Sequence, residues 1–285
     1  MPRFTSKLGS TFYLKKGRLN NKVPLICCHG GPGGNHLSLK PLLELSKSRQ
    51  VTIFDQIGSG NSSSTTKSKW NITAFCKNLN ELISHLGYDQ VILYGSSWGG
   101  TLILEYYKRY PNKVTGLIFH SSLICEKRWK QDAKKLIKAL PQKQQNIINT
   151  CEKITATDAK VYKQAMLEYY KKHVCRVKGI FDNKKPKSKI KFNEDLYQHM
   201  WGPSEFCATG TLKGYNGIAT LSKISVPTLF LCGEYDESTP HSNKFFARKV
   251  KGSQIEVVSN ASHSSLRERK VYTLQILNKF LSQLT

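Results

Sequence analysis

The sequence has few acidic residues and no long apolar segment. Asp and Glu number 19 against 44 Lys and Arg in 285 residues, which gives a formal net charge of +25 at pH 7. No apolar run approaches the roughly 18 residues that a membrane-spanning helix needs. The first residues, Met1 to Lys7, contain no stretch of signal-peptide length. We therefore expect a protein that is neither embedded in a membrane nor exported, and that is located in the cytoplasm.

Closely spaced cysteines and histidines are also missing. The eight cysteines are dispersed along the chain, and Cys27, Cys28 and Cys232 lie inside apolar segments. Buried thiols in a reducing compartment fit this distribution better than a disulfide framework does. Without a C-x-x-C pair, a His-rich cluster or a phosphate-binding glycine motif, the sequence predicts neither a metal site nor a cofactor.

Arginine is scarce among the basic residues. Nine are Arg and 35 are Lys, whereas nucleic-acid sites usually favour Arg for bidentate contacts. Much of the excess falls between Lys127 and Lys191, where 19 basic residues accompany 5 acidic ones. We interpret this charge as a lysine-rich solvated surface and predict no specific nucleic-acid partner.

Short β-like segments alternate with amphipathic helical ones, as is typical of a mostly parallel sheet with helices on both faces. The expected strands are 10–17, 23–28, 51–55, 91–95, 114–120, 228–232 and 254–259, and the expected helices are 36–47, 71–87, 98–110, 240–250 and 270–284. A mostly helical region interrupts this alternation. We expect an α/β core of residues 1–123 and 216–285 and an inserted helical cap of residues 124–215, in which residues 181–189 form an exposed loop.

The junction after the strand 91–95 carries the sharpest chemical signal. Residues 95–99 read G-S-S-W-G and lead from a buried strand directly into a helical pattern. This is the G-x-S-x-G arrangement, whose glycines permit a strained turn that presents the central serine hydroxyl at the start of a helix. The motif predicts an α/β-hydrolase fold with Ser97 as its nucleophile.

A nucleophilic serine needs a base and an acid that orients the base. In this fold they follow the serine in the order Asp or Glu, then His, on loops after later strands. Asp236 comes shortly after the strand 228–232, and His263 follows the strand 254–259. Glu234 is a competing carboxylate two residues before Asp236. We predict a Ser97, Asp236 and His263 triad.

Acyl transfer also needs backbone donors for the developing oxyanion. One is the N–H of the residue after the nucleophile, which is Trp98. The second is expected from the glycine-rich segment His29–Gly34, where we choose Gly31. We expect His29 to be a structural, hydrogen-bonded histidine.

Four motifs together resemble the proline iminopeptidase family along nearly the whole chain. They are H-G-G-P-G-G at 29–34, G-S-S-W-G-G at 95–100, F-D-Q-I-G-S-G-N-S at 54–62 and M-W-G-P-S-E-F at 200–206. The last is similar to the cap motif of the branch that includes tricorn-associated aminopeptidases. The third departs from the family pattern, because Ile57 replaces the usual Arg, which puts the packing of that loop in question.

The resemblance implies a serine exopeptidase that acts through an acyl-enzyme on short peptides with a free N-terminus, releasing preferentially proline. It places Glu205 and Glu237 at positions where the family holds the substrate's α-ammonium. Trp201 and Phe206, with Trp98, could wall an apolar pocket for the pyrrolidine ring. Ordinary solvated glutamates and simple aromatic packing are the alternatives for these residues.

Two other functions stay open at this point. An amino-acid amidase or esterase could use the same triad and oxyanion donors, because they serve any acyl transfer. A polyanion-binding protein with a vestigial site is a distant alternative, suggested by the basic cap. The sequence does not give the oligomeric state.

Overall fold

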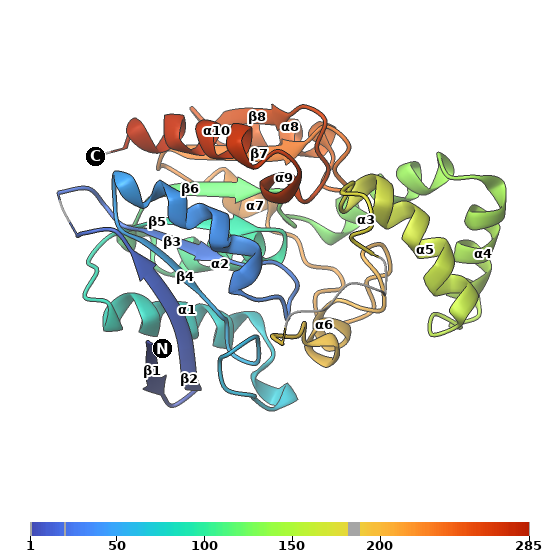
Figure 1. The fold of residues 1–285 in the computed structure, drawn as a ribbon, viewed down its shortest axis with the longest axis horizontal. Coiled ribbons are helices and arrows are strands. Elements are labelled where there is room, and N and C mark those ends of the chain that lie inside the picture. Colours follow the sequence, from blue (N-terminus) through green and yellow to red (C-terminus); the bar gives the residue numbers. More distant parts are fainter. Residues whose placement is uncertain (1, 20, 182–188, 285) are drawn as a thin grey trace.

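The structure, a computed structural model, describes residues 2–19, 21–181 and 189–284. Its centre is an eight-stranded sheet with the strand order β1-β2-β4-β3-β5-β6-β7-β8. The pairs β1–β2 and β2–β4 are antiparallel, and every pairing from β4 to β8 is parallel. The predicted mostly parallel α/β-hydrolase sheet is confirmed (Figure 1).

The strands are β1 (Arg3–Ser6), β2 (Gly9–Lys16), β3 (Leu25–Cys28), β4 (Val51–Phe54), β5 (Val91–Ser96), β6 (Val114–His120), β7 (Thr228–Gly233) and β8 (Gln254–Val258). The α-helices are α1 (Ile72–His85), α2 (Trp98–Arg109), α3 (Glu126–Lys138), α4 (Gln142–Lys153), α5 (Lys160–His173), α6 (Glu194–Met200), α7 (Ile218–Leu221), α8 (Pro240–Ala247), α9 (Ser265–Glu268) and α10 (Lys270–Ser282). Three 3-10 helices complete the set: η1 (His36–Lys47), η2 (Lys67–Lys69) and η3 (Pro111–Lys113).

Both faces of the sheet are buried, as an all-apolar central strand requires. In β3, Ile26 and Cys28 join the cluster formed with α1, α2 and α8. Leu25 and Cys27 point to the other face and pack with η1 and α10. The alternation of side chains along a strand thus divides one apolar run between two cores.

Helices α3, α4 and α5 lie together beyond one end of the sheet (Figure 1). They share an apolar cluster of their own, which includes Ile148, Tyr162 and Tyr169. The chain enters this region after β6 and returns to the core before β7. This agrees with the expected insertion, and the division into a core and a cap at residues 124 and 215 stays a prediction.

Most expected elements fall within a few residues of those observed, and two features differ. Strand β1 was not predicted, because it has four residues and only Phe4 of them is buried. The expected helix at 36–47 is a 3-10 helix that contains Pro41, and proline removes a donor from a regular α-helix. The expected loop at 181–189 falls largely on residues 182–188, which lie outside the described residues.

No helix in the described part of the chain is long and apolar enough to cross a membrane. All eight cysteines are free thiols, and all but Cys207 are buried.

Candidate active site

The chemistry-bearing residues gather at one edge of the sheet. Strands β3, β5, β6, β7 and β8 run parallel, so their carboxyl ends meet at the same edge. The segment after β3 contains Gly31, the one after β5 contains Ser97, and those after β7 and β8 contain Asp236 and His263. Residues distant in sequence are therefore brought together by topology, at the place where open α/β sheets bind their ligands.

Ser97 occupies a strained turn between β5 and α2. Its backbone dihedrals are φ 55° and ψ −121°, a conformation that non-glycine residues rarely adopt. The turn is held by the Ser97 N–H, which donates to the His120 carbonyl at 3.0 Å. A Cβ on Gly95 would lie 2.3 Å from the Gly99 oxygen, and a Cβ on Gly99 would lie 2.3 Å from the Cys28 oxygen. Both motif glycines are therefore required for this close packing.

His263 is oriented by Asp236. The Nδ1 atom of His263 lies 2.9 Å from Oδ1 of Asp236, and the carboxylate is buried. The competing carboxylate, Glu234, instead accepts a hydrogen bond from the backbone of Asn260 at 2.9 Å. Of the two carboxylates that the sequence offers, Asp236 therefore contacts His263 and Glu234 contacts Asn260.

The Asp236 carboxylate is fully supported on its other sides. It accepts hydrogen bonds from the N–H of Gly233 at 3.1 Å, the N–H of Ser238 at 2.8 Å and the hydroxyl of Ser121. Burial lowers the pKa of His263, but the charge and hydrogen bond of Asp236 outweigh it, so that the pKa is raised above 6.5. This arrangement favours an imidazole that can take up a proton.

Ser97 and His263 face a common cavity of about 800 Å³, which Gly30, Gly31 and Glu205 also line. Among the described residues, the Ser97 hydroxyl has no hydrogen-bond partner, His263 included. Catalytic hydrogen bonds are often loose in a free enzyme and tighten when substrate binds. The serine and the imidazole therefore line one cavity without a hydrogen bond between them.

The two expected oxyanion donors are available. Within the described chain, neither the N–H of Gly31 nor that of Trp98 donates a hydrogen bond. Gly31 has a φ of 114°, so the segment after β3 bends through a conformation that favours glycine. Gly30 lies against the nucleophile, because a Cβ built on it would be 3.1 Å from Cβ of Ser97.

Gln56 connects the two oxyanion segments, a role that was not predicted. Its amide nitrogen donates to the His29 carbonyl at 2.9 Å, and its amide oxygen accepts from the Trp98 indole at 2.8 Å. The Gln56 N–H also donates to Nε2 of the buried His29 at 3.1 Å. The D-Q dipeptide at 55–56 was the available signal for this role. Ile57, which stands where the family usually has Arg, is buried in the core.

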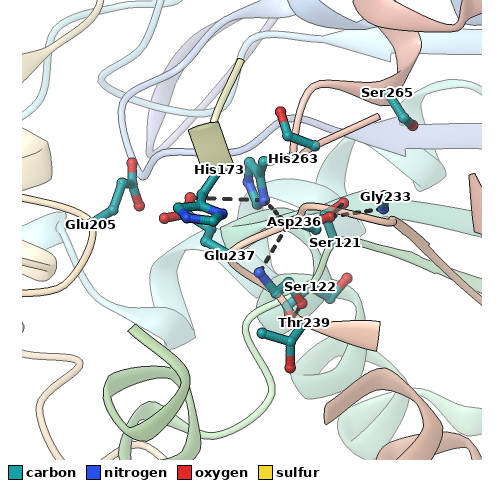
Figure 2. Close-up of polar contacts among 12 residues, drawn as sticks. Ser121, Ser122, His173, Glu205, Gly233, Asp236, Glu237, Thr239, His263 and Ser265 are labelled. Atoms are coloured by element: carbon teal, nitrogen blue, oxygen red, sulfur yellow. Dashed lines mark hydrogen bonds and ion pairs between the residues drawn. The ribbon is translucent and has the colours of Figure 1, made fainter. Parts of the chain in front are cut away.

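Two carboxylates lie next to the imidazole (Figure 2). Oε1 of Glu237 is 3.8 Å from Nδ1 of His263, and neither oxygen of Glu237 has a hydrogen-bond partner in the described chain. Burial raises the pKa of Glu237 well above its usual value, and the charges of Glu205 and Asp236 raise it further, whereas the nearby Tyr169 hydroxyl acts in the opposite direction. Burial also raises the pKa of Glu205, although the His263 charge and the Tyr197 hydroxyl act in the opposite direction. Glu205 lines the cavity, whereas Glu237 is buried beside His263 and is not among the lining residues.

The predicted aromatic wall is placed differently. Neither Trp201 nor Phe206 is among the residues that line the described cavity. Phe206 packs with Tyr169 inside the cap cluster, at 4.9 Å between ring centroids. Trp201 packs on Trp129, whose ring meets His263 edge-on at 5.9 Å and whose indole donates to the Glu205 carbonyl at 2.8 Å. Direct contact of Trp201 and Phe206 with a substrate stays a prediction.

The end of α5 ties the cap to the catalytic loops. The His173 carbonyl accepts the N–H groups of both His263, at 3.1 Å, and Glu237, at 3.3 Å. Nδ1 of His173 lies 2.8 Å from the Tyr235 carbonyl. No sequence pattern signals this contact, because it uses main-chain atoms. Helix α5 therefore holds the loops that carry His263 and Glu237.

The described residues contain no group of three or more His, Cys, Asp and Glu side chains placed to hold a metal ion. The donors at the site are instead a hydroxyl, an imidazole, backbone N–H groups and carboxylates. Together they can transfer an acyl group through the serine and bind a cation beside it.

Comparisons with known proteins agree with this arrangement. A family profile described as alpha/beta hydrolase fold matches residues 23–269. The proline iminopeptidase of Heyndrickxia coagulans is 33% identical over 263 residues, covering 92% of this chain and 91% of that one. The crystal structure of VinJ superposes with a TM-score of 0.90 at 29% identity, covering 100% of this chain and 98% of that one.

The crystal structure of the proline iminopeptidase of Mycobacterium smegmatis has a TM-score of 0.85 and 26% identity, and it covers 99% of this chain and 98% of that one. Similarity over nearly the full length of both chains, together with the geometry above, establishes the family. The chain belongs to the proline iminopeptidase family of α/β hydrolases.

Proposed function

We propose that the protein is a serine exopeptidase that releases an N-terminal residue, preferentially proline, from short peptides in the cytoplasm. Its nucleophile is Ser97, its general base is His263, and Asp236 orients the base. The observation that carries the proposal is the position of two carboxylates: Glu237, which accepts no hydrogen bond from the described residues, lies 3.8 Å from the imidazole, and Glu205 lines the cavity that Ser97 and His263 share.

The mechanism follows from these positions. The Ser97 hydroxyl attacks the carbonyl carbon of the first residue while His263 takes its proton, and the N–H groups of Gly31 and Trp98 stabilise the oxyanion. The imidazolium then protonates the leaving amine, which gives an acyl-enzyme. Water activated by His263 releases the amino acid and regenerates the serine.

The glutamates account for action at the N-terminus. An N-terminal proline carries a secondary ammonium with two N–H donors, so Glu205 and Glu237 can each accept one. A cation between them offsets the burial and mutual repulsion that raise their pKa values. An internal peptide bond offers no such cation, and the cap, which we propose to be a unit of residues 124–215, blocks the chain beyond it.

Blocking the amino group tests this proposal against the esterase and amidase alternative. We expect proline p-nitroanilide with a free amine to be cleaved at least tenfold faster, in kcat/KM, than its N-acetyl form, because the acetyl group removes the cation. Equal rates on the two substrates would assign the site to general amide or ester hydrolysis.

A further inference from the structure

The lining of the cavity also contains basic residues. Besides Ser97 and Glu205, its lining includes Arg267 and Lys270. Arg267 lies on α9, which begins at Ser265, two residues after His263. Figure 2 shows Glu205 and Ser265 on opposite sides of His263. The lining of the cavity thus includes one carboxylate, Glu205, and two basic residues, Arg267 and Lys270.

Arg267 carries the charge that is free to bind a ligand. Within the described residues, its guanidinium has neither an ion pair nor a hydrogen bond. The adjacent Glu268 is already engaged, because its carboxylate accepts from the backbone of Ser262 at 2.7 Å and of Arg176 at 3.0 Å. Lys270 differs, since its ammonium pairs with Glu44 at 2.9 Å.

The short helix α9, which carries Arg267, is held by two buried hydrogen-bond contacts of Ser265. Ser265 Oγ lies 2.8 Å from Nε2 of His120, and both residues are buried. The Ser265 carbonyl accepts from the hydroxyl of Thr273 on α10 at 3.2 Å. The Arg267 backbone is thereby held in place, and less conformational entropy is lost when its side chain binds a ligand.

We propose that Arg267 binds the C-terminal carboxylate of a peptide whose N-terminal ammonium is held by Glu205 and Glu237. This inference rests on the proposed function and narrows its substrate class to peptides of two or three residues. Such peptides carry opposite charges at their two ends, with the scissile bond between them. A planar guanidinium matches a carboxylate through two parallel hydrogen bonds, whereas a longer peptide carries its carboxylate past Arg267.

The experiment compares peptides that differ only in their terminal charge. Hydrolysis of Pro-Gly and Pro-Gly-Gly is measured against the same peptides with amidated C-termini. We expect kcat/KM to be about three- to tenfold higher for at least one free acid than for its amide, because an exposed charge pair contributes modestly. In Arg267→Gln we expect that ratio to fall to about one, with the change expressed mainly in KM.

Arg269→Gln is the matched control, because Arg269 is also exposed but does not line the cavity. It should keep the wild-type ratio. A ratio near one for both peptides in the wild type, or an unchanged ratio in folded Arg267→Gln, overturns the role of Arg267 while leaving the proposed exopeptidase intact. If the wild type cleaves no free-amine proline amide at all, both proposals fall.

Discussion

Asp236 and Glu237 are neighbours in sequence, are equally buried and have opposite surroundings. Asp236 accepts three hydrogen bonds, two from its own loop and one from Ser121, and it also contacts His263. Neither oxygen of Glu237 accepts a hydrogen bond from the described residues, and its ion-pair contact is with Nδ1 of His263 at 3.8 Å. A buried carboxylate without a partner is costly, so it is retained where a ligand supplies the missing cation. The comparison separates a carboxylate held by hydrogen bonds within the protein from one that, under the proposed function, is available to a substrate ammonium.

The largest expected effect is loss of the nucleophile. Ser97→Ala should lower kcat by about 10⁶-fold, because the members of a triad act as a unit. The fold should be retained, since removal of one unpartnered hydroxyl leaves the backbone hydrogen bonds of the turn unchanged. Single-turnover and steady-state assays on proline p-nitroanilide measure the loss, with circular dichroism as the check on folding. More than a few per cent residual activity in folded protein would point to another nucleophile.

The second largest expected effect follows from removing the charge of Glu237 or of Glu205. Glu237→Gln or Glu205→Gln should lower kcat/KM for proline amides by roughly 10- to 150-fold, because a charged hydrogen bond contributes about 1.5–3 kcal/mol. Acyl esters without an amino group should be hydrolysed nearly as fast as by the wild type. Glu234→Gln is the control, since that carboxylate contacts Asn260 rather than the cavity. Equal losses on amides and esters would instead indicate a general disturbance of the triad.

The pH dependence of activity should separate the ionisation of Glu237 from that of the base, His263. His263 must be neutral to accept a proton, and its pKa is raised above 6.5, so activity on an acyl ester should fall about tenfold per pH unit below that raised pKa. On proline amides the fall should be steeper, because Glu237, whose pKa is also raised, must ionise to bind the ammonium. Profiles of kcat/KM on both substrates from pH 5 to 9 provide the measurement, and parallel profiles would remove Glu237 from recognition.

The sequence was sufficient for the parts of the site that depend on local patterns. The elbow at Ser97 and the loops at Asp236 and His263 each follow a recognisable apolar strand, and parallel pairing then brings them to one edge. Gln56, Trp129 and His173 were missed for a different reason. Their contacts join segments far apart in the chain, and each of the three involves main-chain atoms, which leave no side-chain pattern. The same limit explains Trp201 and Phe206, because a motif shows which residues are near the site but not which of them face the cavity.

The smallest expected effect is on stability, and it tests the unpartnered state of Glu237 without any substrate. Because its folded pKa is raised, folding loses free energy as pH rises from the unfolded pKa of about 4.3 towards the folded one. Glu237→Gln removes that ionisation, so it should raise the melting temperature by about 2–4 °C at pH 7–8, equivalent to about 1 kcal/mol. The gain should shrink as pH falls towards the unfolded pKa, where the carboxyl is increasingly protonated in both states. Differential scanning calorimetry across this range measures it, with Glu234→Gln expected to show no such pH-dependent gain. If Glu237→Gln were instead destabilising at every pH, the carboxylate would have a partner in the folded protein, and the contrast with Asp236 would fail.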